Sequence, residues 1–310
     1  MKKILVTGGT GLVGNAIKTI SKNFDYDFIF LSSKDCDLTN YTDTFELFSN
    51  YTPDCVIHLA ACVGGLFKNM KYKVDMFEKN ILININVLKV CHEIGVKKVV
   101  SCLSTCIFPD KTTYPIDEKM LHNGVPHFSN DAYAYAKRML DVQSRAYQEQ
   151  YNDNFICVIP TNIYGPHDNF NLQDSHVIPG LIHKCYLAKQ KGEPFVIAGT
   201  GTPLRQFIYS KDLAILILWA LENYNEIEPI ILSVPESVEK SINFVATCIA
   251  KKLNYENLIF DKEKPDGQFK KTANNSKLLE RIQNFAFTPI EEGISKTVEW
   301  FEANYKNSRK

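Results

Sequence analysis

Short apolar runs alternate with helical patterns along the first half of the chain. Each run is four to six residues long and rich in Val, Ile, Leu and Phe, which is typical of strands buried on both faces. The runs cover residues 3–7, 28–31, 54–59, 98–103 and 155–159. Segments with helical periodicity separate them, notably 12–20, 79–94 and 132–151. Strands that alternate with helices predict a doubly wound α/β fold with a parallel sheet and right-handed crossovers.

The pattern changes after about Pro166. Loops rich in Asn, Asp, Pro and Gly, such as residues 165–175 and 198–206, interrupt shorter helices and strands. We therefore expect a Rossmann-like domain over residues 1–165 and a smaller, irregular lobe that binds substrate, mainly over residues 166–310. A helical pattern at 211–221 and an apolar run at 230–234 suggest that residues 209–234 return to the sheet. The polar tail, residues 305–310, is expected to fray.

Composition excludes several classes of protein. Of 310 residues, 45% are apolar and 23% are charged, as in ordinary globular proteins. Lys plus Arg and Asp plus Glu both equal 35, so no global positive field is present to bind nucleic acid or an anionic membrane. No run approaches the roughly 20 apolar residues that span a bilayer. Nine cysteines are scattered singly, without zinc spacing, which indicates reduced thiols in a cytoplasmic protein and no metal site.

A glycine-rich turn follows the first predicted strand. The sequence GGTGLVG occupies residues 8–14, directly before the first predicted helix. Small residues let the backbone approach a pyrophosphate, and free N–H groups at a helix N-terminus attract it. The alternative is a turn that only packs a strand against a helix, but its position in a first βαβ unit favours a dinucleotide. The cofactor residues predicted by this turn are Gly8, Gly9, Thr10, Gly11, Leu12, Val13 and Gly14.

The end of the second predicted strand indicates which dinucleotide binds. NAD usually requires an Asp or Glu there, to accept from the ribose 2′-hydroxyl. This chain has LSSK instead, and Ser33 and Lys34 suit the 2′-phosphate of NADP(H). An exposed polar turn is the alternative. Further residues predicted by position are Asp37 and Leu38 at the adenine and Leu59, Ala60 and Ala61 near the pyrophosphate.

A serine, a tyrosine and a lysine indicate chemistry at a carbonyl group. Tyr133 and Lys137 are four residues apart on a predicted helix, so their side chains reach the same side. We expect the ammonium to lower the pKa of the phenol, which is near 10 without it. Ser104, at the end of a strand, is predicted to hydrogen-bond the carbonyl oxygen. Thr105 competes for this role, and Tyr135 ranks second as the acid because no lysine follows it at the same spacing.

Several motifs together resemble one family. They are CLSTCIFP (102–109), KTTYPIDE (111–118), PTNIYGPHD (160–168), SHVIP (175–179), PLRQF (203–207) and KPDGQFKK (264–271). They resemble the GDP-L-fucose synthases of the extended short-chain dehydrogenase/reductase superfamily, and the resemblance extends to WFEANY (300–305). It implies an enzyme with two reaction stages. GDP-4-keto-6-deoxy-D-mannose undergoes 3,5-epimerisation, and NADPH-dependent reduction of its 4-keto group then gives GDP-L-fucose.

The resemblance also implies roles for a thiol and an imidazole. In this family the cysteine of S-x-C is the base and the histidine of SHVIP is the acid, which are Cys106 and His176 here. Both groups have ordinary pKa values close enough to neutrality for moving carbon-bound protons. Without the resemblance, Cys106 is interpreted as a small buried hydrophobic residue and His176 as the start of a helix.

The resemblance further implies how the remaining ligand groups are bound. It implies that residues 160–163 line the cofactor and that Asn162 lies near the substrate or nicotinamide. The alternative interpretation of each charged substrate residue is an ordinary solvated charge on the surface. The implied substrate residues are Asn162, Lys184, Arg205, Asp266 and Lys271, with Lys270 competing with Lys271. The implied cofactor residues are Lys137, Pro160, Asn162, Ile163 and His176. One departure is Ala198, where the family often has tryptophan.

Two other functions stay open on the sequence alone. One is a related nucleotide-sugar 4-epimerase or reductase, which needs Tyr133 and Lys137 but not the thiol and imidazole. The other is a non-catalytic NADP-binding regulator. In either case the long helices predicted at 79–94 and 132–151 are expected to pair with their copies in a homodimer.

Overall fold

A six-stranded parallel sheet forms the centre of the molecule. The computed structural model describes residues 1–264, 266 and 270–310. The sheet order is β10-β5-β4-β3-β1-β2, and every neighbouring pair is parallel. Its strands are β1 (Lys2–Thr7), β2 (Tyr26–Phe30), β3 (Cys55–His58), β4 (Lys98–Cys102), β5 (Phe155–Pro160) and β10 (Ile230–Leu232). This is the doubly wound α/β fold that the alternating pattern predicts.

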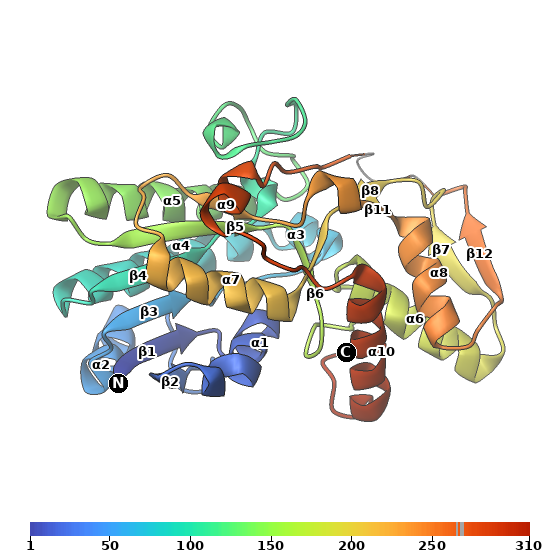
Figure 1. Cartoon of the computed structure of the whole chain (residues 1–310), viewed down its shortest axis with the longest axis horizontal. Helices are drawn as coiled ribbons and strands as arrows, with labels where there is room; N and C mark the ends of the chain where they lie inside the picture. The colour runs from blue at the N-terminus through green and yellow to red at the C-terminus, as the bar shows by residue number, and fades with distance from the viewer. Residues whose placement is uncertain (265, 267–269) are drawn as a thin grey trace.

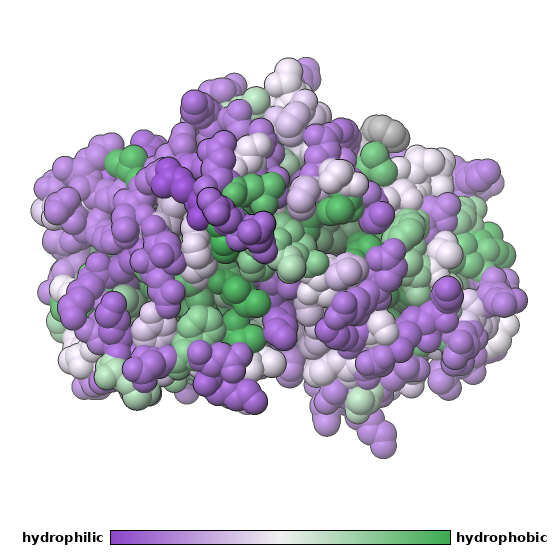
Figure 2. Space-filling model, viewed as in Figure 1, coloured by the Kyte–Doolittle hydropathy of each residue, from purple (hydrophilic) through white to green (hydrophobic). Residues whose placement is uncertain are grey.

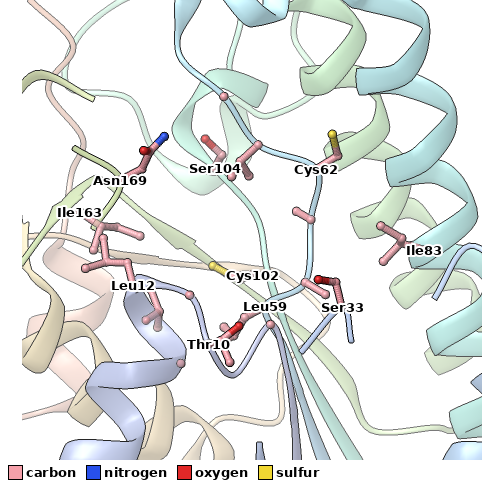
Figure 3. Close-up of a pocket in the computed structure, with 18 of the residues that line it drawn as sticks. Thr10, Leu12, Ser33, Leu59, Cys62, Ile83, Cys102, Ser104, Ile163 and Asn169 are labelled. Carbon is pink, nitrogen blue, oxygen red and sulfur yellow. The ribbon is translucent and has the colours of Figure 1, made fainter. Parts of the chain in front are cut away.

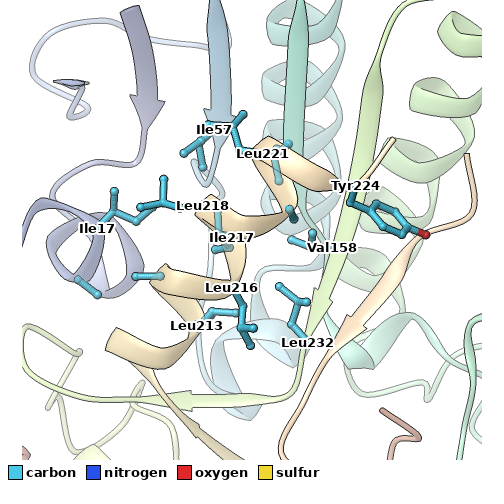
Figure 4. Packing of buried hydrophobic residues seen from close by; sticks show 14 of the residues in the cluster. Ile17, Ile57, Val158, Leu213, Leu216, Ile217, Leu218, Leu221, Tyr224 and Leu232 are labelled. Carbon is cyan, nitrogen blue, oxygen red and sulfur yellow. The ribbon is translucent and has the colours of Figure 1, made fainter. Parts of the chain in front are cut away.

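Helices cover both faces of this sheet (Figure 1). Successive residues of β1 point to opposite faces, so Ile4 and Val6 join one apolar cluster and Leu5 joins the other. The first cluster contains α1 (Leu12–Ile20) and α7 (Ser210–Asn223), and Figure 4 shows α7 side chains packed over the strands. The second cluster contains α2 (Tyr41–Tyr51), α4 (Lys73–Glu93) and α5 (Asp131–Tyr151). Burial on both faces explains why the strands read as continuous apolar runs.

Two helices differ from the sequence prediction. The helix α2 was not predicted, although its N-cap residue is a good one: the side chain of Asn40 accepts a hydrogen bond from Thr42 N at 2.9 Å. The helix α4 begins at Lys73, six residues before the predicted start at residue 79. The apolar periodicity of that first part is weak, because Val74 and Phe77 are exposed there.

The second lobe has a core of its own. It contains α6 (Val177–Lys191), α8 (Ile242–Lys252), α10 (Ile290–Asn304) and a parallel pair of strands, β7 (Phe195–Ala198) and β12 (Leu258–Asp261). Their buried residues form a third apolar cluster. The remaining strands are β6 (Asn162–Tyr164) paired with β9 (Phe207–Tyr209), and β8 (Leu204–Arg205) paired with β11 (Lys240–Ser241). Short helices are α3 (Leu66–Lys71), α9 (Ser276–Arg281) and the 3-10 turns Ser21–Asn23, Thr105–Ile107, Glu118–Met120 and Glu236–Val238.

Two late segments return to the first domain. The strand β10 pairs with β5, which confirms the return of residues 230–234 to the sheet, and Leu278 of α9 is buried in the same cluster as α7. The prediction that residues 305–310 fray is wrong. Arg309 bridges to Asn169 in parallel pairing, and its carbonyl accepts a hydrogen bond from Phe170 N at 2.8 Å.

The surface gives little sign of a membrane protein. On the face shown in Figure 2, hydrophilic side chains cover most of the molecule, and apolar ones gather along the middle and where the two lobes meet. Within the described part of the chain, none of the helices combines the length and apolar character that a bilayer crossing requires.

Candidate active site

A cavity of about 960 Å³ opens at the carboxyl ends of the parallel strands, where ligands bind in doubly wound folds. Figure 3 shows Thr10, Leu59 and Ser104 among its lining residues. Most of the predicted cofactor residues line it: Gly8, Thr10, Gly11, Leu12, Val13, Gly14, Ser33, Asp37, Leu38, Leu59, Ala60, Ala61, Lys137, Pro160, Asn162, Ile163 and His176. The structure does not bring Gly9 or Lys34 to its wall.

The glycine turn forms a cradle that side chains would fill. Gly8 has φ +66°, and a Cβ there would lie 2.9 Å from Ala60 N. A Cβ on Gly14 would lie 2.6 Å from Gly8 O and from two backbone carbon atoms of Gly9. Gly9 itself faces the sheet, where its N–H donates to Leu31 O at 2.7 Å. Since no side chain caps α1 at its N-cap residue, Gly11, the N–H groups of its first turn are free to bind the pyrophosphate of a dinucleotide.

At the end of the cavity predicted for the adenine, the lysine on the wall is not the predicted one. Lys34 is exposed, and it follows Ser32, whose N–H and hydroxyl both donate to Asp35 at 2.7 Å. The cation on the cavity wall here is Lys79 of α4, beside Ile83 and close enough to Asp37 for the two charges to interact. Sequence reasoning missed Lys79 because it lies more than forty residues from LSSK.

Ser104, Tyr133 and Lys137 come together on one wall of this cavity. Lys137 is 2% exposed, and its ammonium donates to Cys102 O at 2.8 Å. Burial lowers the pKa of Lys137 and raises that of Tyr133 well above its ordinary value. The expected lowering of the phenol pKa by Lys137 is therefore not seen in this structure, where burial and charge interaction with three cysteines raise it. Tyr133 stays a phenol at neutral pH and can only donate a proton.

The two competing residues, Tyr135 and Thr105, differ in whether they line the cavity. Tyr135 is exposed and does not line the cavity. Thr105 does line it, so the sequence alternative to Ser104 stays open. The hydroxyl of Ser104 accepts a long hydrogen bond, 3.5 Å, from Cys106 N.

The structure does not bring Cys106 to the wall of either cavity, whereas His176 lines both. Cys106 is partly buried and packs against the apolar cluster that includes α5. Burial raises its pKa, while charge interaction with Lys271 and a hydrogen bond with Ser104 act in the opposite direction. His176 lines both the large cavity and a second one, and burial lowers its pKa. At neutral pH these shifts favour a protonated thiol and a neutral imidazole.

The second cavity, about 270 Å³, lies in the smaller lobe. It brings together His176, Lys184, Ala198, Arg205 and Asp266, of which all but Ala198 were predicted site residues. Lys184 projects from α6 and Arg205 from β8. Burial lowers the pKa values of both Lys184 and Arg205, which marks positions that take up negative charge favourably.

Two of these groups are held by nearby backbone. Arg205 donates to Leu204 O at 2.6 Å. The carboxylate of Asp266 accepts from Thr200 N at 2.9 Å and from the Thr200 hydroxyl at 2.6 Å, so it fixes the turn after β7. The rest of the predicted KPDG motif, Pro265 and Gly267, lies outside the described residues.

Lys270 and Lys271, which competed for one predicted substrate role, differ in their contacts. Lys270 forms an ion pair with Glu236 at 2.6 Å. Lys271 lines neither cavity, but it is near enough to Cys106 and Arg205 for its charge to interact with both. Burial lowers its pKa. Asn162 lines the large cavity and donates to Gln206 O at 2.9 Å.

A buried polar network stands behind the large cavity, and sequence reasoning missed it. The hydroxyl of Thr7 bonds His58 Nδ1 at 2.9 Å, and His58 Nε2 bonds the amide oxygen of Asn84 at 3.2 Å. The amide nitrogen of Asn84 reaches Ala136 O at 3.4 Å, next to Lys137. Burial lowers the pKa of His58 to about 3, so its ring is neutral. The network joins β1, β3, α4 and α5 in the layer beneath the candidate catalytic residues.

Other lining residues also escaped prediction. Asp168, Asn169 and Asp174 come from the 165–175 loop, and Arg309 comes from the tail. The HDNF sequence was a signal for the first two residues. Nothing in the sequence pointed to Arg309.

The fold and the site together define a class of protein. A glycine turn after β1, a strand-end serine and a buried Tyr133–Lys137 pair are the features of an extended short-chain dehydrogenase/reductase. The chain matches the model of the NAD dependent epimerase/dehydratase family over residues 4–234. The chain belongs to this family and, within it, to the GDP-L-fucose synthases, as the following similarities show.

Relatives of high similarity cover the whole chain. The GDP-L-fucose synthase of Dictyostelium discoideum is 56% identical, covering 100% of this chain and 98% of the relative. A probable GDP-L-fucose synthase of Drosophila melanogaster is 52% identical, covering 100% of both. A crystal structure of a GDP-L-fucose synthetase from Naegleria fowleri bound to NADP superposes with a TM-score of 0.96 at 52% identity, covering 100% of this chain and 95% of that one.

Proposed function

We propose that this chain converts GDP-4-keto-6-deoxy-D-mannose to GDP-L-fucose, by 3,5-epimerisation followed by reduction of the 4-keto group with NADPH. The observation that carries this proposal is the convergence of two sets of groups. Ser104, Tyr133 and Lys137 line the dinucleotide cavity, and His176 lines both this cavity and the cationic second one. The thiol of Cys106 lines neither cavity but is hydrogen-bonded to Ser104. Full-length identity to GDP-L-fucose synthases supports the same conclusion.

The first stage needs a base and an acid on carbon-bound protons. A 4-keto group acidifies the protons at C3 and C5, so a base can remove each one and an acid can return it to the opposite face. Cys106 is our candidate base and His176 our candidate acid. Because burial favours the protonated thiol and the neutral imidazole, each must change protonation before it acts. The ammonium of Lys271 assists this change by favouring the thiolate.

The second stage needs a proton for the reduced oxygen. When bound, NADPH supplies the hydride that reduces the carbonyl carbon. Ser104 is proposed to hydrogen-bond the carbonyl oxygen, and Tyr133, which is a phenol at neutral pH, to give it a proton. In this structure the ammonium of Lys137 does not lower the phenol pKa; in the complex with NADPH and substrate it is proposed to stabilise the phenolate as it forms. The cradle of small residues at Gly8 and Gly14 fits the pyrophosphate of the dinucleotide.

The second cavity is proposed to hold the GDP part of the substrate. Arg205 can bind a phosphate through two parallel hydrogen bonds, and Lys184 and Lys271 add positive charge. Asp266 can accept from a donor edge of the ligand only with the oxygen capacity that Thr200 leaves free. With Ala198 on the wall of this cavity, no aromatic ring at that position packs against the nucleoside.

The proposal includes a division between the lobes and a homodimer. Residues 1–165 and 209–234 would hold the cofactor, and most of 166–310 the substrate. The helices α4 and α5 pack together and leave an apolar outer face, which would pair with the same face of a second copy. Its exposed apolar residues are Val74, Phe77, Leu82, Ile85, Tyr135, Met139 and Val142. A cytoplasmic location is supported by the nine free cysteines.

Reaction in deuterated water tests this function. With NADPH and GDP-4-keto-6-deoxy-D-mannose, we expect GDP-L-fucose carrying solvent deuterium at C3 and C5, measured by NMR. Cys106→Ser should lose deuterium incorporation yet still permit direct reduction of the ketone, whereas Cys248→Ser, in the second lobe, should behave as the native protein. Wild-type product without solvent deuterium would remove the epimerase stage, and normal product from Cys106→Ser would exclude the thiol as base.

The same experiment separates the two alternatives. A nucleotide-sugar 4-epimerase or reductase would turn over without deuterium at C3 and C5. A non-catalytic NADP-binding regulator would bind NADPH without consuming it. The presence of both Tyr133 and Lys137 on the wall of the cavity, each with a shifted pKa, favours an enzyme over a regulator.

A further inference from the structure

The segment from Tyr305 to Lys310 is anchored against the 165–170 loop. Arg309 pairs with Asn169, and Phe170 N donates to Arg309 O at 2.8 Å. Ser308 is 8% exposed, and its N–H donates to Asn304 O at 2.8 Å. The 165–170 loop includes His167, a non-glycine residue with φ +67°. An L-residue in this conformation is strained, and such strain gathers at functional sites.

This anchoring brings Arg309 to the wall of the dinucleotide cavity. Figure 3 shows its partner Asn169 on the same side as Ile163 and Leu12, with Ser33 and Ile83 on the other side. Leu12 is the residue that follows Gly11 in the glycine turn. Figure 1 likewise shows the C-terminal end of the chain near α1 and β6. Arg309 therefore lies on the pyrophosphate side of the cavity, away from the adenine.

The guanidinium has hydrogen-bonding capacity to spare. One of its terminal nitrogens donates a hydrogen bond to His167 O at 2.8 Å, and an arginine has five N–H donors. Among the described residues, no carboxylate forms an ion pair with it. Asp168 is near enough for the charges to interact, but burial raises the pKa of Asp168 to about 7, so this carboxyl is only about half ionised at neutral pH and offsets only part of the arginine charge.

The other cations of the cavity are engaged elsewhere. Lys79 pairs with Asp75 at 3.0 Å at the adenine end. Lys137 is buried against Cys102 O, and Lys68 donates to Val63 O at 3.2 Å, within its own loop. A pyrophosphate carries about two negative charges, and the glycine turn offers only neutral N–H groups to it.

We propose that Arg309 binds the cofactor, with its guanidinium contacting the pyrophosphate oxygens at the end of the cavity where the glycine turn lies. The segment that carries it thus completes the cofactor site from the far end of the chain. This inference rests on the proposed use of NADP(H). It adds a residue that neither the glycine turn nor the Ser104, Tyr133 and Lys137 set contains.

Calorimetric titration tests this assignment without turnover. NADPH and NADH are titrated into the wild type, Arg309→Gln, Arg309→Lys and Lys310→Gln. Lys310 is the matched control, since it has the same charge one residue later and does not line the cavity. We expect Arg309→Gln to weaken NADPH binding about tenfold or more, Arg309→Lys to weaken it less because the charge remains, and Lys310→Gln to bind within twofold of the wild type.

Comparing the loss of affinity for NADPH with that for NADH identifies the part of the cofactor that Arg309 contacts. Both contain the pyrophosphate, so Arg309→Gln should weaken NADPH and NADH by the same factor. Unchanged NADPH binding, or a loss restricted to NADPH, would overturn the assignment, the latter because it points to the 2′-phosphate. Equal losses in Lys310→Gln would also overturn it, since the segment rather than the guanidinium would then be responsible. Failure of the wild type to bind NADPH would refute the proposed function instead.

Discussion

The two cavities of this protein bind charged ligands by different means. The dinucleotide cavity is shaped by backbone: Gly8 and Gly14 leave no room for a Cβ, and the first turn of α1 offers its N–H groups. The second cavity is made of long side chains, Lys184, Arg205 and Asp266, which come from three separate segments. With equal numbers of acidic and basic residues in the chain, the proposed sites for the two diphosphates thus differ: one is formed largely by backbone and the other by charged side chains. Substitutions should affect the two cavities differently.

The largest effect is expected at Tyr133, because the reduction step depends on this one side chain and not on how either cavity binds its ligand. Tyr133→Phe removes the phenolic proton donor and keeps the aromatic ring on the wall of the dinucleotide cavity. We expect kcat for reduction to fall about 10³-fold, within the range for a positioned acid, measured by NADPH consumption. Deuterium exchange at C3 and C5 should continue, as should NADPH binding. Reduction at the wild-type rate would refute the assignment of Tyr133 as the acid.

A methyl group in the backbone cradle should have the next largest effect. In Gly14→Ala the new Cβ lies 2.6 Å from Gly8 O, so the turn must shift. We expect NADPH binding to weaken about 100-fold, which is roughly 2.7 kcal/mol, while the affinity for the GDP-sugar changes little. Gly192→Ala is a control of the same type at a site where a Cβ meets nothing, although its φ of +70° adds strain. Equal loss of both ligands in Gly14→Ala would mean that the two cavities are not independent.

The smallest effect is expected at the charged side-chain site. Arg205→Lys keeps the charge but loses the planar pair of donors, so KM for the GDP-sugar should rise about tenfold with kcat and NADPH affinity nearly unchanged. Lys240, paired with Arg205 across β11 and β8 and absent from the wall of the cavity, supplies the control Lys240→Arg. An unchanged KM in Arg205→Lys would show that Arg205 acts as a point charge or not at all.

The sequence predicted the parts of the fold whose signals are local. The strands of the parallel sheet read as apolar runs because both of their faces are buried, and the glycine turn followed the first of them. The helix α2 was missed although it, too, has a local signal in its N-cap residue, Asn40. The predicted effect of Lys137 on the pKa of Tyr133 is not seen: spacing put the two residues on one side of a helix, but it could not tell how deeply the fold buries them.

In the candidate site, too, local motifs indicated some residues and only the tertiary structure revealed others. Motifs indicated Cys106, His176 and Arg205, and the structure brings these segments, far apart along the chain, to adjoining cavities. They could not indicate that Lys79 rather than Lys34 lines the adenine end, since the side chain there comes from α4. Arg309 was assigned to a fraying tail because no local pattern reports the pairing of residue 309 with residue 169.

What the sequence determined by itself is the kind of chemistry, through residue types at short spacing: a glycine turn, a strand-end serine, a Tyr–Lys pair and a thiol two residues from the serine. Only the tertiary structure decided the protonation state of these groups and which distant side chains complete the site. The reason is physical, because pKa values depend on burial and on charges from other segments. Spacing along the chain fixes neither of them.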